Sequence, residues 1–125
     1  MIGSKINIAM SDSIKQVIEK IRVFRDERDW MQFHDPKSMA ASIVIEAGEL
    51  LEHFQWKNKE EADEYVKTHK GEIADEIADV AAYLFEMSDN LGIDLLEAVH
   101  AKIHKNAAKY PVEKSKGVHT KYDRL

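Results

Sequence analysis

Apolar residues recur every three or four positions along most of this chain, as they do on the buried face of amphipathic helices. The clearest example is the run from Ile43 to Phe54, in which Leu50 and Leu51 continue the apolar stripe. The pattern predicts five helices, over about residues 13–29, 36–56, 58–68, 72–91 and 94–110. Four long helices with short connections favour an all-α protein, an antiparallel four-helix bundle with one extra short helix.

Residues that cap helices mark the predicted boundaries. Asp35 precedes Pro36, which suits an N-cap followed by the first helical position. Asn58 and Asp94 each have a glutamate three residues later, the spacing of a capping box. Gly92 is a natural C-cap for the helix before it. These signals place the helix starts more firmly than the apolar spacing does.

The remaining segments are short or polar. Residues 1–10 have no clear period and are expected to be a flexible arm, and residues 112–125 are polar, slightly basic and expected to be mobile. Gly71 is expected to separate the short helix from the following long one. Because no repeat or linker divides the chain, we expect one domain over residues 1–125, with its core at about 13–111.

The composition narrows the class of protein. Of 125 residues, 44% are hydrophobic and 33% charged, with only 5 Gly and 2 Pro, which fits an all-helical chain. No apolar run is long enough to span a membrane, and no signal peptide is evident. The absence of cysteine excludes a disulfide scaffold and thiol chemistry, and fits a cytoplasmic protein. With a net charge of -5, we expect no nucleic-acid or membrane partner, and an anionic substrate would need a local cation.

Two pairs of acids are the main candidate for chemistry. Glu46 and Glu49 in one predicted helix, and Glu76 and Asp79 in another, are each three residues apart and so point the same way. At 100° per residue, both pairs border the apolar stripe of their helix at equivalent angles. If the helices pack antiparallel, four carboxylates converge and suit Mg²⁺ or Mn²⁺. The alternative is that all four are ordinary surface acids.

Cations and aromatic residues are candidates for substrate contact. Lys102, Asn106 and Lys109 border the apolar stripe of the last helix, where they could contact phosphate and base, or serve only as solvent-facing side chains. Trp30 and Trp56 could stack on a nucleobase, or pack in the core or at an interface.

These segments also resemble a known family. The blocks ERDWMQFHDPKSM, EAGELLEHFQW and EIADVAAYLFEMSDNLGIDLLEAVHAKIHKNAAKYP are similar to the MazG-like all-α nucleotide pyrophosphohydrolases, and closest to their dCTP pyrophosphatase branch. The similarity runs from about Ser13 to Pro111. The family signature, E-x-x-E followed by E-x-x-D, is matched by the two acid pairs. The family's closing K-x-x-x-N-x-x-[RK]-Y-P run is matched at Lys102, Asn106, Lys109, Tyr110 and Pro111.

The resemblance implies an activity and a site. The reaction would convert a nucleoside triphosphate and water into a monophosphate and pyrophosphate, as in nucleotide pool sanitation. The four acids would hold Mg²⁺, with Lys102, Asn106 and Tyr83 near the nucleotide and Trp30 and Trp56 at the base. The resemblance also implies a homo-oligomer, a dimer or a tetramer built from dimers, with pockets completed across subunits.

The chemistry of the residues agrees with this reaction. Phosphoryl transfer needs neutralised phosphate oxygens and an in-line nucleophile, and a carboxylate could deprotonate the attacking water. We expect Glu49 to be that base, although nothing in the sequence separates it from the other three acids. His53 departs from the close relatives, which have an apolar residue there; it could pack at an interface or contact the acids, and it weakens the assignment to dCTP.

Two other functions are compatible with a helical bundle. A di-iron carboxylate protein needs paired E-x-x-H motifs, but the chain has one, Glu97-x-x-His100, with His104 one turn further on. A helical module that binds nucleotides or partners without turnover is the alternative outside enzymes. Product analysis with each deoxynucleotide separates these possibilities.

Overall fold

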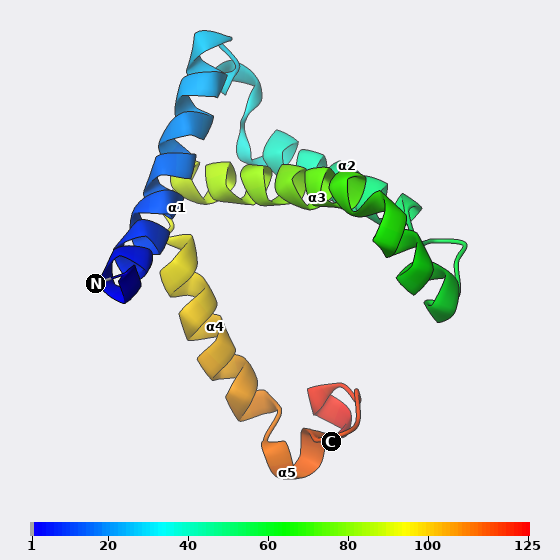
Figure 1. The fold of residues 1–125 in the computed structure, drawn as a ribbon. Helices are drawn as coiled ribbons and strands as arrows, with labels where there is room; N and C mark the ends of the chain where they lie inside the picture. Colours follow the sequence, from blue (N-terminus) through cyan, green and yellow to red (C-terminus); the bar gives the residue numbers. More distant parts are fainter. Residues whose placement is uncertain (1) are drawn as a thin grey trace. The chain divides into compact units, whose positions relative to one another are not determined.

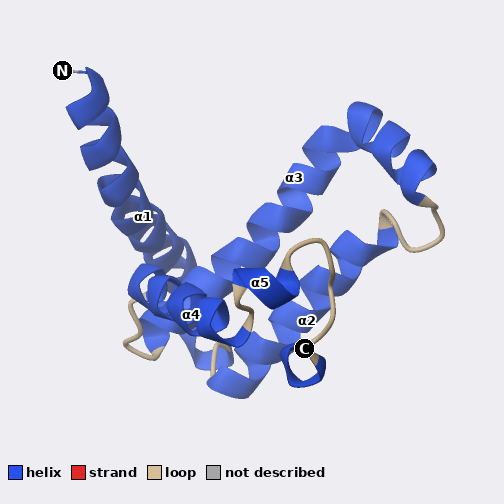
Figure 2. Cartoon of the chain, turned by 90° about the horizontal axis from the view of Figure 1, so that it is seen from below, coloured by secondary structure: helices blue, strands red, loops and turns tan. Residues whose placement is uncertain are grey.

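The computed structural model describes the backbone of residues 2–125 and the side chains from residue 14 on, and every regular element in this part is helical (Figure 2). The elements are α1 (Ile2–Glu27), η1 (Met31–Phe33), α2 (Pro36–Glu52), α3 (Lys59–Asn90), α4 (Leu95–Lys109), α5 (Val112–Ser115) and η2 (Tyr122–Arg124). The all-α prediction is therefore confirmed. The chain forms two compact units, one up to Leu91 and one from Gly92.

The predicted caps account for the helix starts. The Asp35 carboxylate accepts a hydrogen bond from the Ser38 backbone at 2.9 Å and opens α2 ahead of Pro36. Asn58 and Glu61 form a reciprocal capping box at the start of α3. At the other end of this helix, Gly92 has a φ of +68°, a conformation that costs glycine least.

Several predicted boundaries need correction. α1 begins at Ile2 and not near residue 13, and α2 ends at Glu52 and not at Trp56. The predicted helices 58–68 and 72–91 both lie within α3, and the backbone leaves helical geometry between them at His69, while Gly71 stays helical. A glycine inside a helix costs only about 1 kcal/mol, so the packed turns on either side can carry it.

The break in α3 lies at His69, where the backbone leaves helical geometry at φ −121° and ψ 21°. Its ring stacks on Tyr65 with centroids 3.8 Å apart, and its Nδ1 lies 3.1 Å from the Tyr65 carbonyl oxygen. A side chain that competes for a carbonyl of the preceding turn is a known cause of helix kinks.

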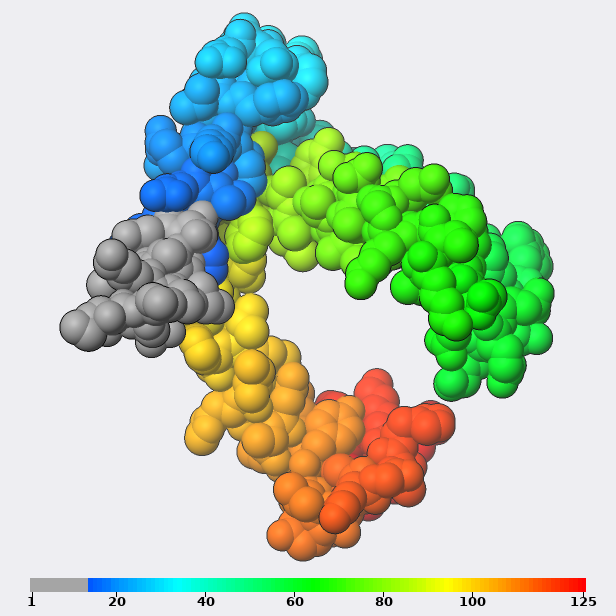
Figure 3. Space-filling model, viewed as in Figure 1, coloured from blue at the N-terminus to red at the C-terminus, as the bar shows by residue number. Residues whose placement is uncertain are grey.

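In the first unit, α2 lies alongside α3, and α1 packs against α3 near its C-terminal end (Figure 1). The space-filling view shows residues of α1 from 14 on covering that end (Figure 3). Met39 of α2 and Ile73 of α3 are the most buried apolar side chains, at 1% and 8% exposure. The α2–α3 pair thus brings the two predicted acid-bearing helices together.

The second unit contains α4, the fourth long helix, followed by α5 and η2. The sequence did not predict either short helix. Tyr110 and Tyr122 make an edge-to-face contact with centroids 6.1 Å apart, and Lys109 Nζ lies 4.7 Å from the centre of the Tyr122 ring. Among the helices described, none is long and apolar enough to cross a membrane. That the whole chain is one domain stays a prediction.

Candidate functional site

Three of the four predicted acids converge between α2 and α3. Glu46, Glu49 and Glu76 each offer a carboxylate oxygen, and these oxygens all lie within 4.8 Å of one another. The i, i+3 spacing on α2 aims the first pair at α3, and the neighbouring helix supplies the third acid. Asp79, one turn further along α3, is close enough to affect both Glu46 and Glu76 electrostatically, but is not part of this set.

The acid cluster of Glu46, Glu49 and Glu76 carries an electrostatic cost. Partial burial, followed by the proximity of Glu49, raises the pKa of Glu46 to about 7. Burial and Glu49 likewise raise the pKa of Glu76. One oxygen of Glu46 and one of Glu76, both Oε2, are buried without a hydrogen-bond partner. Buried polar atoms without partners are rare in native proteins, and they point to a missing cation or water.

The donor set fits a hard divalent cation. All of the candidate ligands are carboxylate oxygens, as Mg²⁺ and Mn²⁺ prefer, and neither thiol nor imidazole belongs to the set. Asp79, one turn further along α3, would be available as a fourth ligand. A bound cation would satisfy the two unpartnered oxygens and remove the repulsion that raises the pKa of Glu46.

A cavity of about 320 Å³ adjoins the acid cluster, with Asp79 in its wall. Trp30 and Tyr83, both predicted to contact substrate, line it, together with Phe24 and Ile21 of α1. The Phe24 and Trp30 rings meet edge to face with centroids 5.6 Å apart. This largely apolar cavity lies next to a cluster of carboxylates. Its size and its lining are typical of small-molecule sites.

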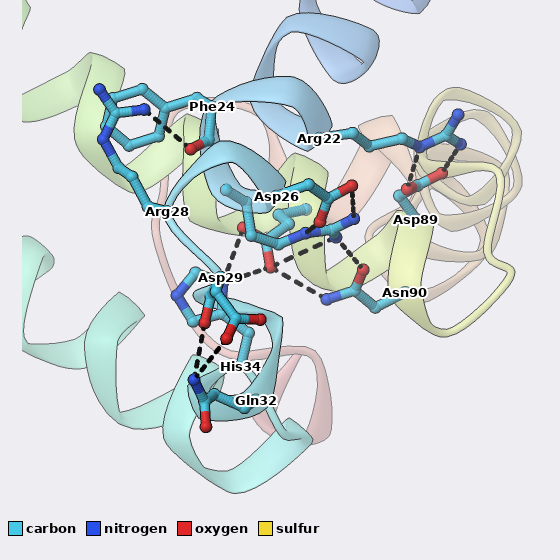
Figure 4. Close-up of polar contacts among 11 residues, drawn as sticks. Arg22, Phe24, Asp26, Arg28, Asp29, Gln32, His34, Asp89 and Asn90 are labelled. Carbon is cyan, nitrogen blue, oxygen red and sulfur yellow. Dashed lines mark hydrogen bonds and ion pairs between the residues drawn. The ribbon is translucent and has the colours of Figure 1, made fainter.

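The cavity also has a polar wall that the sequence analysis missed. Glu86 of α3 is buried and bonds His34 Nδ1 at 2.7 Å, and Asn90 donates to the same carboxylate at 3.0 Å. Arg25 of α1 donates to Asn90 at 3.0 Å. Figure 4 labels His34 and Asn90 of this network, and shows Arg22 of α1 reaching across to Asp89 of α3. These contacts fix α1 and the loop at His34 against α3.

A second hollow is lined by two acids of the cluster. Its lining consists of Glu49, Glu52, His53, Tyr65 and Glu76. His53 Nδ1 lies 2.7 Å from the Tyr65 hydroxyl. The Tyr65 ring stacks on His69, and Lys57 Nζ lies 4.1 Å from the centre of the Tyr65 ring. His53 therefore packs on Tyr65 within its own chain and faces the same hollow as two of the acids.

The other predicted substrate residues do not line this cavity within the first unit. Trp56 follows α2 in a turn and is 88% exposed. Lys102 and Asn106 are exposed residues of α4, with Lys109 at its end and Tyr110 just after it. These four residues belong to the second unit, and their contact with substrate stays a prediction.

One signal in the sequence could have revealed Glu86. Glu76, Asp79, Tyr83 and Glu86 follow one another at spacings of three, four and three, so they lie along one face of α3. The E-x-x-D motif ends at Asp79, and the same face of α3 then continues along the cavity. The partners of Glu86 gave no such signal, because Arg25 and His34 are distant in sequence.

Comparison with known proteins shows the family to which this chain belongs. The profile of the MazG-like family matches residues 41–125, a span that includes all four predicted acids. The chain belongs to the MazG-like family. It is 36% identical over 121 residues to dCTP pyrophosphatase 1 of Bos taurus, an alignment that covers 92% of this chain and 72% of that protein. The proteins of the same name from Mus musculus and Homo sapiens are 38% and 35% identical over 104 residues, which is 61% of their length.

A solved structure extends the comparison to the fold. The crystal structure of a pyrophosphatase from Archaeoglobus fulgidus is 44% identical, with a TM-score of 0.76, and the match covers 79% of this chain and 93% of that one. The family and the fold expected from the sequence are therefore confirmed. The names of these relatives agree with the activity that the sequence predicted.

Proposed function

We propose that this protein is a Mg²⁺-dependent nucleotide pyrophosphohydrolase that converts a nucleoside triphosphate, dCTP or a modified dCTP, into the monophosphate and pyrophosphate. The observation that carries the proposal is the acid cluster of Glu46, Glu49 and Glu76 beside a nucleoside-sized cavity. The relatives named dCTP pyrophosphatase 1 support the choice of substrate.

The proposed metal ligands are Glu46, Glu49, Glu76 and Asp79, with Mn²⁺ as a possible substitute for Mg²⁺. The cation supplies positive charge that neutralises phosphate oxygens and activates the attacking water. Glu49 accepts the proton from that water. It is the most suitable of the three clustered acids because it is the one that is exposed, whereas Glu76, which lines the same polar hollow, and Glu46 are partly buried.

The nucleotide is proposed to lie with its base in the cavity and its phosphates toward the acids. Asp79 lines the cavity and is also close to the cluster, so it marks the junction between the two. The residues assigned to substrate binding are Trp30, Trp56, Tyr83, Lys102, Asn106, Lys109 and Tyr110. The lysines would offset phosphate charge in a chain whose net charge is -5.

We further propose a homo-oligomer, a dimer or a tetramer built from dimers. Large apolar side chains are exposed on both units, including Val44 at 71%, Ile45 at 60% and Ile103 at 60%. A chain of this length normally buries most of its apolar side chains, so these faces need a partner surface. The exposed Trp56 would then complete a pocket on a neighbouring subunit. A cytoplasmic location and a role in nucleotide pool sanitation stay predictions.

A panel of nucleotides tests the proposal. Purified protein is incubated with Mg²⁺ and each standard deoxynucleoside triphosphate, with 5-methyl-dCTP and with ribonucleotides, and kcat/KM is measured for each. We expect turnover, with the highest kcat/KM for a cytosine nucleotide. Absence of turnover with every nucleotide would overturn the proposal and favour a non-catalytic nucleotide-binding module.

A further inference from the structure

A buried carboxylate lies in the wall of the cavity assigned to the base. Glu86 is only 4% exposed, yet it lines this largely apolar cavity together with Trp30 and Tyr83. Burying a charge is costly unless hydrogen bonds and counter-charges surround it. The question is therefore which of the two Glu86 oxygens the protein itself satisfies.

The protein partners of Glu86 converge on one oxygen. Oε2 accepts from Asn90 Nδ2 at 3.0 Å and lies 2.7 Å from His34 Nδ1 and 3.9 Å from Arg25 Nη1. Among the side chains that the structure describes, Oε1 has one hydrogen-bonding contact, with the same His34 nitrogen at 3.0 Å. Each carboxylate oxygen can accept two hydrogen bonds, so Oε1 keeps acceptor capacity on a side chain that lines the cavity.

The surrounding residues hold this acceptor in place. Arg25 Nη1 donates to Asn90 Oδ1 at 3.0 Å, and Arg25 Nε donates to Asp26 at 2.8 Å, so the guanidinium is itself fixed. His34 holds the carboxylate from the loop that leads into α2. Glu86 is therefore an immobilised acceptor, which is what discrimination between similar ligands requires.

We propose that Glu86 sets the base selectivity of this enzyme by accepting a hydrogen bond from the 4-amino group of cytosine, with His34, Asn90 and Arg25 as positioning residues. An ionised carboxylate accepts hydrogen bonds and cannot donate them. Cytosine presents an amino donor at this edge, whereas uracil and thymine present a carbonyl oxygen that a carboxylate repels.

The geometry also argues against guanine. Guanine offers two adjacent donors that pair best with both oxygens of one carboxylate. Here Oε2 is already bonded to Asn90 and His34, so only one oxygen is open. A single amino group is the better match. This inference rests on the proposed function, since it assumes that the cavity holds the base of a nucleotide.

Monophosphate binding tests the inference without relying on turnover. The affinities of dCMP, dUMP and the dCMP analogue with hydrogen in place of the 4-amino group are measured by calorimetry with the full chain and Mg²⁺. We expect dCMP to bind about 10-fold or more tightly than either of the other two, since a hydrogen bond to a charged group is involved. Equal affinities, or no binding of dCMP, would overturn the inference.

A matched pair of variants tests whether the preference for dCMP over dUMP depends on Glu86. Glu86→Gln removes the charge with little change in shape, and Asp89→Asn removes a charge from the same helix outside the cavity, where Asp89 pairs with Arg22. We expect the preference for dCMP over dUMP to fall toward 1 in Glu86→Gln and to persist in Asp89→Asn. A preference that survives in folded Glu86→Gln, checked by thermal melting, would contradict the role of Glu86.

The analogue series in the wild-type protein keeps the test decisive if Glu86→Gln does not fold. The experiments also distinguish a failure of the proposed function from a failure of the inference about Glu86. Failure of the proposed function means that no triphosphate is hydrolysed. Failure of the inference means that triphosphates are hydrolysed but that loss of the 4-amino group does not weaken binding.

Discussion

Glu46 combines two properties at the scale of a single residue. Its pKa is raised to about 7 by burial and by the acids around it, and its Oε2 has no partner. The folded metal-free protein therefore holds a proton at Glu46 that the unfolded chain, with a pKa near 4.5, releases earlier. Between these two values the folded state binds more protons, so the free energy of unfolding contributed by Glu46 falls as pH rises.

The measurement for this effect is denaturant unfolding of metal-free protein from pH 4.5 to pH 8, compared with Glu46→Gln. We expect the wild type to lose stability relative to the variant across this range, and the difference to level off above pH 7. Hydrogen bonds lower the pKa of Asp35 and the pKa of Asp89, so these two groups change the free energy of unfolding at lower pH. Their contributions are the same in the wild type and the variant, and they cancel in the comparison. A difference that does not change with pH would contradict the raised pKa.

The acid cluster gives a second prediction at this scale. Glu76→Gln removes one of the three converging carboxylates, whereas Glu72→Gln removes an exposed acid one turn earlier on the same helix. We expect Glu76→Gln to weaken Mg²⁺ binding and to lower kcat/KM by about 100-fold or more, as loss of transition-state stabilisation does, while Glu72→Gln stays near wild type. Calorimetry with Mg²⁺ alone and a turnover assay check both; near-normal activity of Glu76→Gln would exclude it as a ligand.

At the scale of the helix, local signals predicted starts better than ends. Asp35 and Asn58 begin α2 and α3 as expected, because capping is a contact between residues three apart and is visible in the sequence. The separation predicted between residues 68 and 72 is present, but it lies at His69 and not at Gly71. The residue itself could not be predicted because the stacking on Tyr65 and the competition for the Tyr65 carbonyl depend on side-chain packing.

The cap of α2 can be tested directly, because this helix presents Glu46 and Glu49. Replacing Asp35 with alanine removes the bonds to the Ser38 backbone and hydroxyl. We expect a loss of about 1 kcal/mol in the free energy of unfolding. Urea denaturation measures it, with Asp35→Asn as the conservative control, since asparagine also caps helices. If alanine costs nothing, the cap does not stabilise α2.

At the scale of the whole molecule, the sequence predicted the three acids that converge and a fourth, Asp79, that lies outside the set, but not what lies around them. The spacing of Glu46 with Glu49 was enough to predict the acid cluster once two helices were paired. The buried Glu86 was missed because its role depends on Arg25 and His34, which approach it only after α1 and the following loop pack on α3. Long-range contacts of this kind have no signature in one sequence.

The exposed apolar faces support the proposed homo-oligomer, which a mass measurement tests. We expect light scattering after size exclusion to give a mass of two or four chains. We also expect Mg²⁺ to raise the melting temperature, because it binds only the folded acid cluster. Ca²⁺-free and Mg²⁺-free buffer with chelator is the reference condition. A stable monomer with no response to Mg²⁺ would contradict both the oligomer and the metal site.

The central claim is the reaction itself, and the identity of its products tests it most directly. Phosphorus NMR of dCTP incubated with the protein and Mg²⁺ distinguishes the possible cleavages. The account predicts dCMP and pyrophosphate in equal amounts, with no signal for dCDP, and no reaction in chelator. Formation of dCDP and inorganic phosphate, or intact dCTP after prolonged incubation, would contradict it.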